Sequence, residues 1–217
     1  MTQSGFILAV MNLSLDPSLS PMVPLFAAAD DAYLAGLDSA ALVALVERQV
    51  ARCVEHARKH FPRLPSPLVW CDLRGKSAGQ AHFGRGGVRF NPILLADQPR
   101  AFLNEVVAHE VAHWVVHHVV RRRVAPHGVE WRTVMVGLYG LPPRTTHRFD
   151  TSRSSPAPYL YLCECRGADL QPRIHRFSER RHRFALRGGR YRCRSCGAWL
   201  CYHGRQDSDI WRMGQEA

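Results

Sequence analysis

Two histidines four residues apart, inside a long apolar helical stretch, restrict this chain more than any other feature. His109 and His113 lie within 100–120, where apolar residues recur at helical spacing on one face: Phe102, Leu103, Val106, Val107 and Val111. Side chains at i and i+4 leave the same helical face, so both imidazoles can reach one metal ion. The stretch predicts a helix that carries part of a metal site.

The residue after the first histidine is a glutamate, Glu110. Its offset around the helix places its carboxylate beside a metal bound by His109 and His113 without making it a ligand. There it can take a proton from the water that a zinc ion activates and later deliver it to a leaving amine. The motif therefore predicts a zinc hydrolase site of the protease type, with Glu110 as the catalytic residue.

A catalytic zinc ion needs a third protein ligand and an open position for water. We expect His127 to be that ligand, because the Pro-His-Gly turn at 126–128 lets the chain fold back towards the motif helix. Glu130 is the alternative, although a carboxylate there also suits a helix N-terminus. His117 lies far along the helix axis from the ion, and His118 is expected at the surface.

The sequence around this motif predicts a small α+β fold. Apolar residues recur at helical spacing from Ser39 to about His60, and a shorter helix is expected over about 129–139. Three short β-rich stretches are separated by Gly and Lys/Arg turns, at 68–73, 81–83 and 88–91. We expect helices packed on a small antiparallel sheet.

Four of the seven cysteines fall into two close pairs: Cys163, Cys165, Cys193 and Cys196. Four thiolates can close a tetrahedral structural zinc site, and such pairs indicate metal binding more than a disulfide framework. We expect all four thiolates as ligands, and the open alternative is that His175 or His182 takes the place of one of them, which would be Cys165. Strand candidates around the pairs predict a small β zinc ribbon, and they lie at 159–162, 183–186, 191–192 and 199–202.

Breaks in composition divide the chain into parts. Pro, Ser and Asp interrupt every apolar run before residue 36, and 151–158 is rich in Ser, Thr, Pro and Arg. We expect an N-terminal extension at 1–36, poorly ordered or docked, a catalytic core at 37–145, a linker at 146–158, the zinc ribbon at 159–205 and a tail at 206–217.

The net charge of +11 lies entirely in the C-terminal part, where 121–217 hold nineteen basic residues against eight acidic ones. Arginines are interleaved with aromatic residues around the cysteines, and the candidate nucleic-acid contacts are Arg173, Arg176, Arg180, Arg181, Arg183, Arg190 and Arg192. Arginine with aromatic neighbours suits phosphate contact and the stacking of single-stranded bases. We expect a DNA partner, while acidic proteins, RNA and a plain basic surface stay open as alternatives.

The first Lys or Arg is Arg48, so the charged start of a signal peptide is missing, and no apolar run approaches the ~20 residues that a membrane span requires. We therefore expect a cytoplasmic protein without a membrane partner.

Further motifs accompany the helix in a fixed order: DLRGKSAG at 72–79, RFNP at 89–92, HEVAH at 109–113 and HGVEW at 127–131. With the Tyr-x-Cys-x-Cys and Tyr-x-Cys-x-x-Cys segments, which begin at Tyr161 and Tyr191, the set resembles the SprT-like family of zinc metalloproteases over about 40–205. The resemblance implies a minimal zincin-like core in which His109, His113 and His127 bind zinc and Glu110 is the general base.

The same resemblance implies a second, structural zinc ion in the ribbon and a polypeptide substrate. Spartan-type members of the family digest proteins crosslinked to DNA, so DNA–protein crosslink repair is implied as well. Two other hypotheses remain at this point. One is a non-catalytic zinc- and nucleic-acid-binding regulatory protein, and the other is a hydrolase whose substrate is not a polypeptide.

Overall fold

The computed structural model describes residues 22, 24–120, 122–166 and 172–206. The chain divides into two units, which meet in sequence between Asp150 and Thr151, and each unit has its own hydrophobic core. Among the described helices, none combines the length and the apolar character that crossing a bilayer requires.

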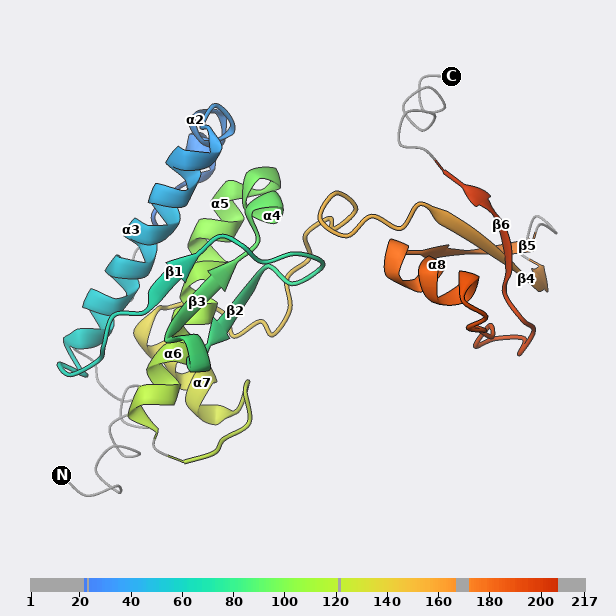
Figure 1. Ribbon diagram of the computed structural model, residues 1–217. Helices are drawn as coiled ribbons and strands as arrows, with labels where there is room; N and C mark the ends of the chain where they lie inside the picture. The colour runs from blue at the N-terminus through green and yellow to red at the C-terminus, as the bar shows by residue number, and fades with distance from the viewer. Residues whose placement is uncertain (1–21, 23, 121, 167–171, 207–217) are drawn as a thin grey trace. The chain divides into compact units, whose positions relative to one another are not determined.

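Helix α3 (Ser39–Arg58) forms where apolar spacing predicts it. Asp38 caps its start, because one carboxylate oxygen accepts a hydrogen bond of 2.8 Å from the backbone N–H of Ala41. The inward stripe includes Leu42, Leu45, Val46, Val50, Cys53 and Val54, all at most 4% exposed. This stripe packs against the helix that carries the metal motif (Figure 1).

The sheet of the first unit is mixed, so the prediction of an antiparallel sheet is wrong for one strand. Strands β1 (Leu68–Trp70), β2 (Gly79–His82) and β3 (Gly87–Phe90) lie in the order β1-β3-β2. A tight turn joins β2 to β3, which makes this pair antiparallel. The chain first crosses from β1 to the far edge, so β1 lies on the other side of β3 and runs parallel to it.

A continuous helix runs from Pro99 to Val119 in three segments, which agrees with the helix predicted over 100–120. They are α5 (Pro99–Ala101), the π-helical η3 (Phe102–Val106) and α6 (Val107–Val119). Before it lies α4 (Pro92–Asp97), capped by the Asn91 side chain. Helix α6 packs on β2 and β3, so the motif helix lies against the sheet (Figure 1).

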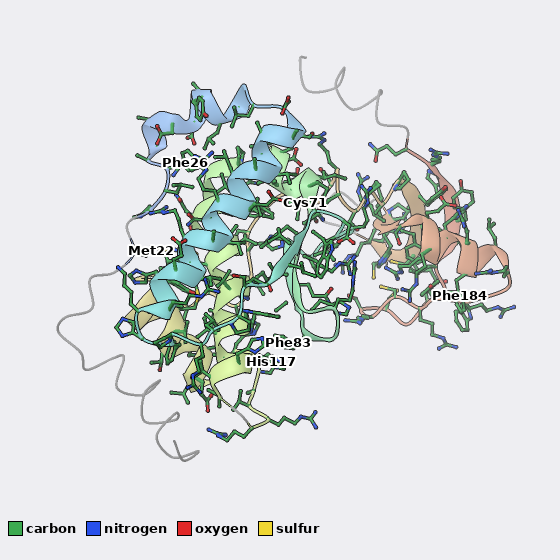
Figure 2. The ribbon with its side chains drawn as sticks, turned by 60° about the vertical axis from the view of Figure 1, so that its left-hand side comes forward. Met22, Phe26, Cys71, Phe83, His117 and Phe184 are labelled. Atoms are coloured by element: carbon green, nitrogen blue, oxygen red, sulfur yellow. The ribbon has the colours of Figure 1, made fainter. Side chains whose placement is uncertain are left out.

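Part of the N-terminal extension is docked on this core through η1 (Ala28–Asp30) and α2 (Asp31–Ala35). The Asn104 amide oxygen accepts hydrogen bonds from the backbone N–H groups of Leu25 and Phe26, at 3.0 and 3.3 Å. The side chains of Met22 and Phe26 also pack against this core (Figure 2). The rest of the predicted extension, 1–21 and residue 23, lies outside the described residues.

Helix α7 (Val129–Thr133) continues into the π-helical η4 (Val134–Leu138), close to the helix predicted over 129–139. Gly128 stands at its N-cap position. Trp131, Val134 and Leu138 are fully buried, so this helix is anchored in the core beside α6.

Within its described residues, the second unit contains three antiparallel strands in the order β5-β4-β6, with one helix. The elements are β4 (Tyr159–Arg166), β5 (Pro172–Phe177), α8 (Glu179–Leu186) and β6 (Cys201–Arg205). The predicted strand at 183–186 is wrong, because these residues end α8, and β5 was not predicted. Residues 191–192 and 199 contribute only the isolated bridge between Arg192 and Trp199. The predicted tail is described only at Gln206.

Candidate metal centre

Three histidine side chains converge at the contact between α6 and the turn before α7. The Nε2 atom of His109 lies 3.2 Å from Nε2 of His113 and 3.1 Å from Nε2 of His127. Two nitrogens bound at ~2.0–2.1 Å to one tetrahedral ion would lie roughly 3.3 Å apart. The donor atoms of His109, His113 and His127 could therefore hold one metal ion, and their spacing suits zinc.

Burial keeps these imidazoles in the neutral form that binds metals. Burial, followed by the nearby His127, lowers the pKa of His109 to about 4. Burial, with His109 and His127 beside it, lowers the pKa of His113 to about 3. The pKa of His127 is lowered too, first by burial and then by Arg132. No proton then competes for the ring nitrogens near neutral pH.

Trp131 and the backbone of Arg144 hold His109 in place. The indole N–H of Trp131 donates to the His109 carbonyl oxygen at 3.3 Å, and the Trp131 ring centroid lies 4.7 Å from those of both His109 and His127. The His109 ring also has a hydrogen bond with the backbone of Arg144. A ring nitrogen occupied in this way leaves Nε2 directed at the shared site.

Glu110 is buried beside the histidines, against the backbone of strand β2. A Cβ atom on Gly79 would lie 2.6 Å from Glu110 Oε1 and 2.5 Å from its Cγ, so only glycine leaves room for this carboxylate. The Ala81 backbone N–H donates a hydrogen bond to it. Burial raises the pKa of Glu110 to about 8, and the Ala81 hydrogen bond opposes part of that rise. Such a pKa suits a group that both accepts and releases a proton.

The other residues weighed as third ligand lie elsewhere. Glu130 is buried but forms an ion pair of 2.5 Å with Arg122. The His117 ring stacks on Phe83, with centroids 4.0 Å apart. His118 is only partly exposed and packs on Trp114 at 4.3 Å, so its expected surface position is only partly right.

The second unit brings together the four cysteines of the two predicted pairs. Their sulfur atoms all lie within 4.8 Å of one another. The Sγ atoms of Cys165 and Cys193 are 3.7 Å apart, close to the roughly 3.8 Å that two thiolates at ~2.3 Å from a tetrahedral zinc ion would show. This group could hold a second metal ion, with a donor set that suits a closed structural zinc site.

The turn of the second pair stabilises a thiolate. Backbone N–H groups at Cys196 and Ser195 donate to the Cys193 sulfur and lower the pKa of this thiol to about 5. Gly197 permits the turn by adopting a left-handed φ of 74°. His175 and His182 stand outside the group of four sulfurs: His175 Nε2 contacts Cys163 Sγ at 3.2 Å, and His182 stacks on Tyr159 at 3.7 Å.

The predicted arginines lie on β5, on α8 and in the segment before Cys193, and several of them lie on aromatic faces. The guanidinium of Arg181 is 3.9 Å from the Phe177 ring centroid, and that of Arg192 is 4.1 Å from the Trp199 centroid. Arg190 lies 5.6 Å from the same Trp199 ring.

Three further predicted contacts already have protein partners: Arg173 bonds Ser195, Arg176 bonds Gln206, and Arg183 pairs with Glu179. Arg180 lies in the first turn of α8 and is exposed. The predicted arginines thus include some that stack on aromatic rings, some that bond other side chains, and the exposed Arg180. A nucleic-acid role for them stays a prediction.

Sequence reasoning did not assign a role to Gly79, Trp131 or the backbone of Arg144. Gly79 and Trp131 stand inside two of the motifs, at 72–79 and 127–131, and an isolated glycine in a strand signals a close approach of another group. Nothing in the sequence marks Arg144, because its contribution comes from the main chain.

Comparison with known proteins agrees with the motifs. The model of the SprT-like family matches residues 50–147. Protein SprT of Pseudomonas fluorescens strain Pf-5 is 40% identical over 157 residues, covering 72% of this chain and 93% of that protein. Protein SprT of Pseudomonas aeruginosa strain UCBPP-PA14 is 41% identical over the same length and shares of the two chains. No solved structure matches the chain. The family match and these relatives show that the chain belongs to the SprT-like family.

Proposed function

We propose that this protein is a zinc-dependent endopeptidase that acts on proteins associated with nucleic acid. The observation that carries the proposal is the meeting of three histidine Nε2 atoms with a buried glutamate at the backbone of a sheet strand. A zinc ion bound there would lower the pKa of its bound water, which could then act as the nucleophile, and would polarise the substrate carbonyl.

The chain's own residues divide the remaining work. His109, His113 and His127 would hold the ion, while Trp131 keeps two of these rings in position. Glu110 accepts the proton of the attacking water and delivers it to the leaving amine. The Ala81 N–H holds its carboxylate during both transfers.

Strand β2 offers a place for an extended substrate. It forms one edge of the three-stranded sheet, and its Gly79 and Ala81 contact Glu110. Besides the Ala81 N–H, which already bonds Glu110, an edge strand offers backbone groups with which an extended peptide can pair as a further strand. A polypeptide paired with β2 would run past Glu110, which favours peptide hydrolysis over other carbonyl substrates.

The second unit supports a nucleic-acid partner. Residues 172–206 hold ten arginines and a single acidic residue, Glu179. Several guanidinium groups lie on aromatic rings, which suits contact with phosphates and stacked bases of single-stranded DNA. We infer that this unit recruits the peptidase to DNA-bound or DNA-crosslinked proteins in the cytoplasm, at the nucleoid.

The test is an incubation of the zinc-loaded full chain with a DNA-binding protein, with and without single-stranded DNA. Wild-type protein should cleave it, Glu110→Gln should lose turnover and keep its zinc, and Glu55→Gln, an exposed carboxylate on α3, should behave as wild type. Cleavage by Glu110→Gln would refute the general-base role. No cleavage by wild type, with about two zinc ions per chain, would favour a non-catalytic zinc- and nucleic-acid-binding protein.

A further inference from the structure

Phe83 and His117 form an exposed aromatic stack where strand β2 ends, and we call this pair the aromatic shelf. Their ring centroids are 4.0 Å apart and their planes are inclined by only 7°. Phe83 is 43% exposed and His117 is exposed as well. Figure 2 shows the two side chains next to each other. Exposed apolar side chains are common on proteins, so what singles out this pair is its position next to strand β2 and on helix α6, which carry the candidate site.

The shelf is held in a fixed position from both sides. Trp114 is 3% exposed, its ring lies 6.4 Å from Phe83 and 6.5 Å from His117, and its indole N–H donates to the Pro65 carbonyl at 2.8 Å. The turn η2 (Phe83–Arg85) is closed by the His82 ring, which accepts from the Arg85 backbone N–H. A surface already ordered in this way loses little entropy when it binds a side chain.

The shelf lies four residues beyond His113 and two residues beyond Ala81, next to the two elements that carry the candidate reaction centre. Phe83 is the first residue after β2 and follows Ala81, the contact of Glu110, by two residues, which is at most about 7 Å of chain. Along α6, His117 follows His113 by four residues, which is about 6 Å of helix and the same helical face. Both distances correspond to about two residues of an extended peptide.

We infer that the aromatic shelf is a substrate subsite, which binds an aromatic or large aliphatic side chain about two residues from the cleaved bond. The inference rests on the proposed peptidase function and adds a specificity to it. Ring faces attract other rings and aliphatic groups by stacking and by burying apolar surface. A carboxylate side chain would gain neither from Phe83.

The experiment measures binding without cleavage, in the zinc-loaded full chain carrying Glu110→Gln. Two fluorescent alanine-rich peptides are compared by anisotropy, one with a single phenylalanine and one with alanine at that place. The phenylalanine peptide should bind about 3- to 10-fold more tightly. Adding Phe83→Ala should remove this difference, and Phe83→Leu should keep part of it. Tyr33→Ala, which removes a 60% exposed ring on α2, should leave it unchanged.

The inference is overturned if the two peptides bind alike, if neither binds, or if the difference persists in Phe83→Ala. Single-stranded oligothymidylate tests the other class of ligand: weaker oligonucleotide binding by Phe83→Ala, with the peptide difference intact, would make the shelf a nucleobase site. The two proposals also fail separately. If Phe83→Ala removes the difference in peptide affinity while the wild-type protein cleaves no substrate, the result would support the aromatic shelf as a binding site and contradict the peptidase function.

Discussion

Replacing Gly79 with alanine tests whether strand β2 positions the catalytic carboxylate. The new Cβ would lie 2.5 Å from Cγ and 2.6 Å from Oε1 of Glu110. Ordinary contacts between carbon atoms begin at about 3.5 Å, so the carboxylate or the strand must move by about 1 Å. Misplacement of a catalytic group by that distance can lower the rate by about 10²-fold. We expect Gly79→Ala to lower kcat/KM for protein cleavage by this factor.

Zinc content is the second readout for this variant, because the three atoms nearest to a Cβ at residue 79 all belong to Glu110 and none to a histidine. It should stay at the wild-type value while the activity falls. Gly36→Ala is the matched control, since a Cβ there meets its nearest atom, the Tyr33 carbonyl oxygen, at an ordinary 3.6 Å. Full activity of Gly79→Ala would show that β2 does not position Glu110. Loss of zinc would show that the strand supports the metal group instead.

Three other changes test the metal groups and the basic unit. Replacing Cys193 and Cys196 with serine should lower the zinc content by about one ion per chain and unfold the second unit, as measured by metal analysis and limited proteolysis. An unchanged zinc content would contradict a structural zinc site at these cysteines. Trp131→Phe keeps a ring but loses the N–H donor to His109, and should weaken zinc binding about 10-fold in a chelator competition. Binding of single-stranded DNA should weaken as the salt concentration rises. Arg181→Ala or Arg192→Ala should each lower the slope of the logarithm of the binding constant against the logarithm of the salt concentration by about one. Binding that does not depend on salt would contradict phosphate contacts.

Local spacing predicted the elements that carry the ligands. The apolar stripe and the i, i+4 histidines both require a helix, so α6 and the common face of His109 and His113 followed from the sequence. The turn containing Gly128 predicted that the chain brings His127 back to that helix. In the structure, its Nε2 atom lies 3.1 Å from Nε2 of His109. In both cases, the residues that carry the sequence signal lie within a few positions of the residues whose structure it predicts.

The errors arose where the signal was weak or distant. Strand β1 has three residues, and nothing in so short a strand shows whether its partner runs parallel or antiparallel. In 183–186, alternation of Phe184 and Leu186 with small or basic residues resembled a strand. The i, i+4 pair of Glu179 and Arg183, after Ser178 at the N-cap position, was the better signal and indicates a helix.

Strand β2 connects the two functional demands on this site. Gly79 gives Glu110 its space and Ala81 gives it a hydrogen bond, while Phe83 of the aromatic shelf directly follows the last residue of the strand. A change that shifts the strand must therefore alter the position of the carboxylate and the affinity for an extended peptide together. A change confined to Phe83 should alter only the affinity. Comparing kcat with KM for the two kinds of variant separates the positioning of Glu110 from substrate recognition.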